Sequence, residues 1–183
     1  MRLVQNKLLA LLIFFTMSLL GVQHTYASDM SVTLADQELL LNGVGLRKKG
    51  PFKVYQASLY LSQKANSTEA VISQTGPKRV SLLMLRSVGK KKMIDAIVSG
   101  FKANTADMST IQAEVDQFVT MIGDAKKRQS IVFDYVPNVG TTITQAGQNK
   151  GTIEGSAFFE ALLRVWLGDK PVNPKLKAGL LGS

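Results

Sequence analysis

Arg47 is the residue whose chemical type and surroundings most suggest a functional site. It follows a largely apolar stretch, residues 39–46, and precedes the aromatic and aliphatic segment Phe52–Leu61. A guanidinium beside an apolar cavity can hold a carboxylate or a phenolate through paired hydrogen bonds while aliphatic side chains bury the rest of the ligand. An ordinary arginine at a turn would show the same spacing, so the sequence leaves both interpretations open.

The N-terminal segment 1–27 has the pattern of a cleavable secretory signal. One arginine and one lysine precede an apolar run at residues 8–20, and a small-residue cleavage site follows at Ala27. The run is shorter than the roughly 20 apolar residues that cross a bilayer, which disfavours an uncleaved membrane anchor. We therefore expect cleavage after Ala27 and a mature chain, residues 28–183, that is free in the periplasm.

Several kinds of chemistry are excluded by the residue types that the mature chain would lack. The one histidine, His24, lies within the expected signal, and the sequence has no cysteine. These absences exclude thiol nucleophiles, disulfides, histidine bases and the usual metal ligands, so we expect no metal and no cofactor. Three carboxylates, Asp134, Glu154 and Glu160, remain as acid or base groups, but no spacing brings two of them together. Charge stabilisation and binding are the functions left.

The chain is strongly basic. Its formal net charge is +9, which becomes +7 when the two cations of the expected signal are subtracted. The cations form four short clusters, at residues 47–49, 78–79, 90–92 and 126–128. Such clusters are typical of solvated turns and helix ends, and the functional alternatives are anionic lipid headgroups, polyanions or an acidic ligand. Nucleic acid is not expected, because no aromatic-rich basic motif accompanies the charge.

Strand-like segments occupy both ends of the mature chain. Residues 32–35 and 38–43 predict a hairpin around Asp36-Gln37, and Phe52–Leu61 predicts a longer strand. Further strands are expected at residues 79–85, 130–135, 141–145 and 151–154, with turns at Pro137-Asn138 and at residues 147–150. Asn66, with Glu69 three positions later, predicts the cap of a short helix that ends at Ser73.

Helical periodicity dominates the middle and the end of the chain. Apolar residues recur at helical spacing over residues 93–101 and 111–122, with a break near 105–107, and again over 158–166 after a cap at Ser156. This order predicts a single α+β domain whose mainly antiparallel sheet is covered on one face by helices. The aromatic stripe Phe158, Phe159 and Trp166 is expected to be core rather than a ligand box.

Gly43-Val44-Gly45 follows an apolar strand and superficially suggests a dinucleotide-binding turn. That fingerprint requires a helix next, whose N-terminus faces the pyrophosphate. Here a strand is expected next, so we reject this interpretation.

Two segments resemble the chalcone isomerase family. Residues 41–47 (LNGVGLR) with Phe52–Leu61 (FKVYQASLYL) are similar to its glycine-bearing strand, its arginine and a strand that ends in Tyr-Leu. Residues 158–182 look like the C-terminal helix and tail of the bacterial chalcone isomerase-like branch, with 166–171 (WLGDKP) as the most specific run. The resemblance extends over essentially the whole of residues 28–183.

This resemblance implies an open-faced β-sandwich, with a ligand cleft between an antiparallel sheet and a helical layer. Plant isomerases of the family close a flavanone ring by attack of a phenolate on an enone, and related noncatalytic members bind fatty acids. Both uses rely on an arginine that holds an anion, and Arg47 matches it.

The other catalytic positions of the isomerases do not carry over. The threonine of the second strand corresponds to Tyr55 or Gln56, because the register is ambiguous. The tyrosine and the asparagine of the helix after the central strand correspond to Lys92 and Ser99. We therefore predict no catalytic residue and a ligand site formed by Arg47, Tyr55, Gln56, Lys92 and Ser99.

Three hypotheses follow. The first is a noncatalytic periplasmic protein that binds a small apolar molecule with an acidic head, such as a fatty acid, through Arg47. The second is an isomerase or intramolecular lyase in which Arg47 stabilises charge and Tyr55 or Lys92 transfers protons. The third is an envelope interaction module whose basic clusters contact an anionic membrane. The sequence predicts no oligomeric state.

Overall fold

Within residues 28–183, seven strands form one antiparallel sheet in which each strand pairs with the next along the chain, in the order β1 to β7. The computed structural model describes residues 28–183. The strands are β1 (Ser31–Leu34), β2 (Gln37–Lys49), β3 (Phe52–Leu61), β4 (Lys78–Met84), β5 (Ser130–Val136), β6 (Gly140–Gln145) and β7 (Gln148–Ile153). The helices are α1 (Thr68–Ile72), α2 (Lys90–Asn104), the short 3-10 helix η1 (Met108–Ile111), α3 (Gln112–Met121), α4 (Ala157–Leu167) and α5 (Pro174–Leu180).

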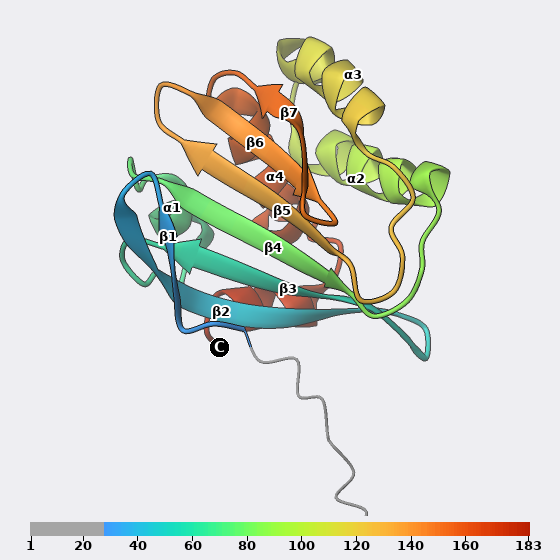
Figure 1. Ribbon diagram of the computed structural model, residues 1–183, viewed down its shortest axis with the longest axis horizontal. Coiled ribbons are helices and arrows are strands. Elements are labelled where there is room, and N and C mark those ends of the chain that lie inside the picture. The colour runs from blue at the N-terminus through green and yellow to red at the C-terminus, as the bar shows by residue number, and fades with distance from the viewer. Residues whose placement is uncertain (1–27) are drawn as a thin grey trace, which may run out of the picture.

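Within the described residues, the helices lie on one side of the curled sheet, and the other face carries none of them (Figure 1). This arrangement confirms the predicted α+β fold with a sheet covered on one face. Alternation along β3 distinguishes the two faces of the sheet, because Tyr55, Ala57 and Leu59 belong to the hydrophobic core whereas Gln56 points to the other face.

The predicted signal, residues 1–27, lies outside the described residues. Within residues 28–183, no helix combines the length and apolar composition needed to cross a bilayer.

Two tight hairpin turns lie one or more residues away from their predicted positions. The β1–β2 turn is Ala35-Asp36, with φ of 49° and 58°, and the β6–β7 turn is Ala146-Gly147, with φ of 52° and 78°. Two central residues in the left-handed region are typical of a type I′ turn, whose twist matches that of paired strands. Strand pairing therefore resumes at Gln37 and Gln148, residues that were predicted to lie in turns.

The cap of α1 also differs from the prediction. Ser67, not Asn66, is the N-cap, and its hydroxyl accepts a hydrogen bond from the Ala70 amide at 3.1 Å. A serine hydroxyl performs this role as well as an asparagine amide does, so sequence spacing could not separate the neighbours. The break after α2 was predicted correctly, and there the Asp107 carboxylate accepts a hydrogen bond from the Ser109 amide at 2.9 Å.

Strand β2 continues six residues beyond its predicted end at Gly43. The reason is the helix α5, which was not predicted and which crosses β2 at backbone distance. A Cβ atom on Gly43 would lie 2.2 Å from the Gly179 carbonyl oxygen, and one on Gly45 would lie 2.4 Å from the Leu176 carbonyl oxygen. Glycine is required where two backbones approach this closely. The two glycines of the Gly43-Val44-Gly45 motif are therefore packing residues inside a strand.

Asn42 stabilises the same crossing of α5 over β2 through side-chain hydrogen bonds. Its side-chain Nδ2 donates to the Leu180 carbonyl at 2.7 Å and to the Ala65 carbonyl at 2.9 Å, while its Oδ1 accepts from the Ala65 amide at 2.7 Å. The residue is buried, so each of these bonds satisfies a polar atom that water does not reach. One amide thus joins β2, the segment after β3, and α5.

The core lies between the sheet and the helices and is rich in aromatic side chains. Phe158, Phe159 and Trp166 of α4 are buried, which confirms that this stripe is core. Phe158 packs against Phe101 and Phe118 with ring centroids 5.7 and 5.6 Å apart, and Phe159 stacks on Tyr135 at 5.1 Å. These contacts fix the position of α4 relative to α2, α3 and β5.

We predict that Gly43→Ala destabilises the protein by about 1–3 kcal/mol, because its Cβ would overlap two α5 carbonyl oxygens. Urea unfolding would show a lower midpoint with an unchanged slope. Gly76→Ala is the matched control, since a Cβ there would lie 3.4 Å from its nearest neighbour, the Ser62 hydroxyl. Equal midpoints for the two variants would contradict the tight crossing.

Candidate functional site

A cavity of about 550 Å³ lies between the sheet and the helices α2 and α4. Strands β2, β3 and β4, the segment that joins β4 to α2, and the segment after α4 all contribute to its wall. Apolar side chains form much of the lining: Val54, Tyr55, Leu82, Val88, Met93, Ile97, Val165, Trp166 and Val172. Cationic side chains also line it: Arg47, Lys49, Arg86 and Lys92.

Strand register places Arg47 and Tyr55 side by side. Arg47 on β2 is directly opposite Tyr55 on β3, and Tyr55 is opposite Met84 on β4. Residues that face each other across antiparallel strands point to the same side of the sheet, which here is the side of the helices. The two residues therefore reach the cavity together, at a point where a bulge between Arg47 and Lys48 interrupts the regular pairing.

The same alternation removes the ambiguity between Tyr55 and Gln56. Tyr55 lines the cavity, whereas Gln56 lies outside it and points to the face without helices. There its side-chain amide is 3.3 Å from the Ser28 hydroxyl. Because successive residues of a strand face opposite sides, only one of the two could reach the ligand site.

The Tyr55 phenol connects the sheet to α4. Trp166 Nε1 donates a hydrogen bond to the Tyr55 oxygen at 2.9 Å, and both residues are buried. An indole N–H can only donate, so the tyrosine oxygen acts as acceptor and its own proton is left to donate elsewhere. Burial raises the pKa of Tyr55 above its usual value, although the Trp166 hydrogen bond and the Arg47 charge both act to lower it. The phenol is thus neutral at physiological pH.

Helix α2 forms the second wall and is pressed closely onto α4. A Cβ on Gly100 would lie 2.5 Å from the Val165 side chain, so the glycine permits the close crossing. Met93 and Ile97 turn their buried side chains to the cavity from this helix. Lys92 and Ser99 also line the cavity but are exposed, which places them at its rim rather than at its floor.

Positive charge dominates the charged lining. Asp95 is the carboxylate among the described lining residues, and it accepts a hydrogen bond from Lys91 Nζ at 2.7 Å. Arg47 donates through Nη1 to the Lys48 carbonyl oxygen, and Arg86 lies over the Phe52 ring at 4.7 Å from its centroid. An arginine has five N–H donors, so one bond to a carbonyl leaves donors for an anion. The arrangement suits an acidic group near Arg47.

Carboxylates elsewhere do not form a second centre. Asp134 pairs with Arg79, with a 2.7 Å bond between Oδ2 and Nη2, and Glu154 and Glu160 are exposed. Within residues 28–183, no group of three or more histidine, cysteine, aspartate or glutamate side chains could hold a metal ion.

Four of the five predicted site residues meet at the cavity: Arg47, Tyr55, Lys92 and Ser99. Sequence reasoning missed Lys49, Phe52, Arg86 and Trp166. Trp166 was assigned wholly to the core, because the aromatic stripe carries no sign that one of its rings borders a void. Arg86 follows β4 directly, and its position after a strand was the signal that could have identified it.

The sequence profile of chalcone isomerase-like proteins matches residues 22–182, which is most of the chain. This chain belongs to the chalcone isomerase-like family. The fold agrees with a crystal structure of an Arabidopsis thaliana fatty-acid binding protein, with a TM-score of 0.59. The two are 14% identical, and the alignment covers 82% of this chain and 95% of the plant chain. A comparison with curated protein sequences gives no match.

We predict that Tyr55→Phe lowers the stability of this chalcone isomerase-like protein by about 1–3 kcal/mol near neutral pH, because the buried Trp166 N–H loses its acceptor. The folded-state pKa of Tyr55 is raised, so the wild type loses stability as pH rises above about 10, while the variant lacks this loss. The stability difference should therefore shrink above pH 10, as measured by urea unfolding across pH. A difference that stays constant would contradict the role of the buried phenol. Ser99→Ala, at an exposed rim position, serves as control.

Proposed function

We propose that this protein binds, without catalysis, a small amphipathic molecule with an acidic head group, such as a fatty acid. The observation that carries the proposal is the pairing of Arg47 with Tyr55 in the wall of a largely apolar cavity. The related Arabidopsis thaliana structure, a fatty-acid binding protein, supports the same class of ligand.

Arg47 and Tyr55 together suit a carboxylate head group. The guanidinium supplies a positive charge and several N–H donors, which bind carboxylates through short, charge-assisted hydrogen bonds. The Tyr55 hydroxyl already accepts from Trp166 and stays protonated, so it donates to the same head group. Lys49, Arg86 and Lys92 add positive charge around this point.

The rest of the cavity suits an apolar body. Its volume of about 550 Å³ lies within the range of roughly 300–1,000 Å³ that small-molecule sites have. Side chains such as Leu82, Met93 and Val165 offer no hydrogen bonds, so they favour hydrocarbon over water. Each methylene that enters contributes about 0.8 kcal/mol.

The same geometry supports binding over isomerisation. By resemblance, the isomerases have a tyrosine and an asparagine where this chain has Lys92 and Ser99, and both of these residues are exposed at the rim. A phenol whose pKa is raised is a poor general base, which weakens the role of Tyr55 in proton transfer. The arginine alone can hold an anion but does not supply the other groups.

We predict that Arg47→Ala weakens fatty-acid binding by about 10- to 100-fold, the value of one charge-assisted hydrogen-bonded contact. Native mass spectrometry of the delipidated, refolded protein with added fatty acids would measure the bound fraction. Arg47→Lys should restore part of the affinity because the charge returns without the planar fork.

Gln56→Ala is the matched control, because it lies one residue from Tyr55 on the opposite face of the sheet. Binding that is absent in the wild type, or equal in Arg47→Ala and Gln56→Ala, would refute the proposal. Turnover of chalcone-like enones by the wild type, followed by their absorbance, would favour the isomerase hypothesis instead.

The proposal includes a periplasmic location, which rests on the pattern of residues 1–27. We predict that the protein exported from a bacterial host begins at Ser28. Intact-mass measurement of the periplasmic fraction would test this directly. A chain that retains residues 1–27, or that stays with the membrane after a high-salt wash, would show an anchor instead.

A further inference from the structure

Basic residues from three distant parts of the sequence meet at one end of the molecule, around the cavity. They come from the β2–β3 hairpin, from the β4–α2 segment with the first turn of α2, and from the α3–β5 segment. We call this set the cationic end: Lys48, Lys49, Lys53, Arg86, Lys90, Lys91, Lys92, Lys126, Lys127 and Arg128. Three of its members, Lys49, Arg86 and Lys92, also line the cavity.

Backbone hydrogen bonds hold the two longer segments of the cationic end together. Val88 and Ala125 exchange both of their backbone bonds, at 2.8 and 2.9 Å. The Lys127 amide donates to the Ser87 hydroxyl at 3.1 Å, and the Arg128 amide donates to the Met84 carbonyl at 2.8 Å. Cations that are separated by about 40 positions in the chain are therefore fixed on one surface.

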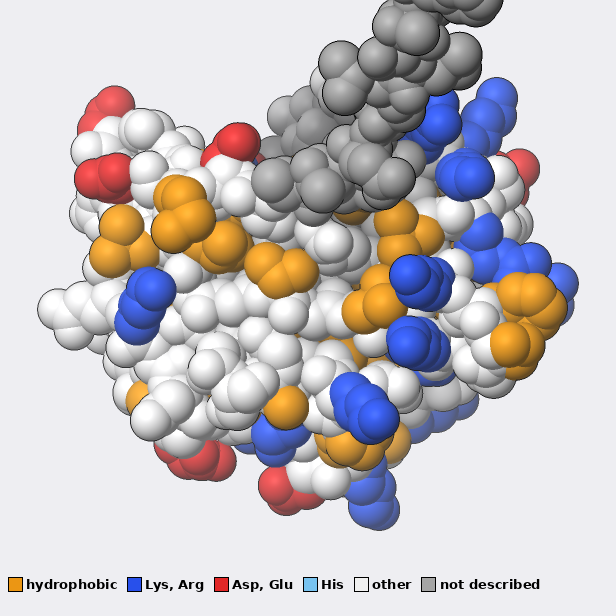
Figure 2. All heavy atoms as spheres, turned by 90° about the horizontal axis from the view of Figure 1, so that it is seen from below, with side chains coloured by type: hydrophobic (Ala, Val, Ile, Leu, Met, Phe, Trp, Pro, Cys, Tyr) orange, Lys and Arg blue, Asp and Glu red, His pale blue; other side chains and the backbone are white. Residues whose placement is uncertain are grey.

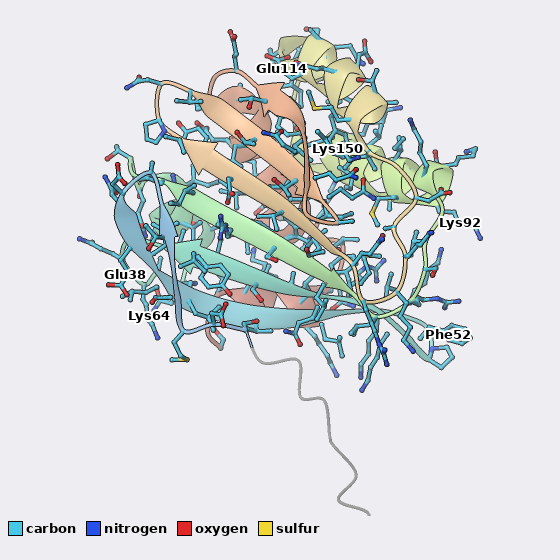
Figure 3. The ribbon with its side chains drawn as sticks, viewed as in Figure 1. Glu38, Phe52, Lys64, Lys92, Glu114 and Lys150 are labelled. Carbon is cyan, nitrogen blue, oxygen red and sulfur yellow. The ribbon has the colours of Figure 1, made fainter. Side chains whose placement is uncertain are left out.

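Few carboxylates offset this charge. Asp95 pairs with Lys91 at 2.7 Å, and the Asp124 carboxylate accepts a bond from the Lys90 amide, also at 2.7 Å. Figure 2 shows blue side chains gathered around orange ones at the right of the molecule, while several red side chains lie at the left. Figure 3 places Phe52 and Lys92 at that right end, and Glu38 and Lys64 at the opposite one.

Phe52 places an exposed apolar side chain within the cationic end. Its side chain is 57% exposed at the start of β3, directly after the hairpin turn at Gly50-Pro51. Arg86 lies over its ring, and the ring itself belongs to the cavity wall. An exposed aromatic ring among lysines is typical of proteins that bind the interface of an anionic bilayer, where the ring enters the headgroup region.

From this arrangement, we propose that the cationic end docks on an anionic lipid bilayer, with the cavity opening toward the lipid. The docking proposal is argued from the charges and Phe52 alone. The role of docking rests on the function proposed above, because an amphipathic ligand would then pass between bilayer and cavity without crossing bulk water. The apolar cavity beside the ring favours a lipid surface over a nucleic acid, because a nucleic acid has no hydrocarbon chain to place in it.

The experiment measures binding of the exported protein to vesicles by flotation. Vesicles of phosphatidylcholine alone are compared with vesicles that also contain phosphatidylglycerol, at low and high salt. We expect binding to the anionic vesicles only, and a loss of binding as salt screens the charges. Equal binding to both vesicle types, or no binding to either, would overturn the proposal.

Charge reversal locates the surface. The variant Lys126→Glu/Lys127→Glu/Arg128→Glu changes residues of the cationic end that do not line the cavity. We expect it to lose about tenfold or more of its vesicle affinity. The control, Lys64→Glu/Lys102→Glu/Lys150→Glu, changes the net charge equally at positions outside the cationic end and should stay within about twofold of the wild type. Equal losses in both variants would show an effect of net charge alone and would overturn the assignment.

Fatty-acid binding in the same variants separates the two proposals. Native mass spectrometry should show unchanged ligand binding in the triple variant of residues 126–128 while its vesicle binding falls. If the wild type binds vesicles but no fatty acid, the docking surface stands and the ligand proposal fails. Tighter binding to a DNA duplex or to an acidic protein than to vesicles, lost in the same variant, would assign the surface to a polyanion and refute the lipid proposal.

Discussion

The hydrogen bond between Trp166 and Tyr55 is the interaction on which the candidate site depends. It joins strand β3 to helix α4 at the wall of the cavity. Because the indole can only donate, the phenol oxygen must accept, and the phenol's own proton can donate to another group. A single bond therefore joins the two layers at the cavity wall and leaves the phenol proton as a donor there.

The charges of Tyr55 and Arg47 also determine which ligand the candidate site suits. Tyr55 is buried and neutral, and Arg47 beside it is charged and partly accessible. A neutral donor next to a cation is suited to stabilising an anionic ligand group without proton transfer, because neither side chain accepts or releases a proton. This property fits the binding function proposed above. A site of proton transfer requires a group whose pKa lies near the working pH.

Much of the fold could be predicted from periodicity, because the helices α2, α3 and α4 and the strands β3, β4 and β5 bury apolar residues at regular spacing. The predictions were wrong where long-range contacts decide the local structure. Strand β2 runs on past Gly43 because the distant α5 lies against it, and α5 itself is short and partly polar. Within the candidate site, Arg47 could be predicted from its apolar surroundings and from the family resemblance. The choice of Tyr55 over Gln56, and the roles of Phe52 and Arg86, depend on register and on segments that meet only in three dimensions.

The crossing of α5 over β2 also has a consequence for the order in which the molecule assembles. The bond from Asn42 to the Leu180 carbonyl joins residues 138 positions apart, so most of residues 28–183 lie within the loop that this contact closes. Loop closure on this scale is slow relative to local helix and hairpin formation, and it waits until the C-terminal residues have been synthesised. Strand β2 therefore stays uncovered on its inner face until residues 174–180 have been synthesised. The last helix of the described residues is the one that completes their first long strand.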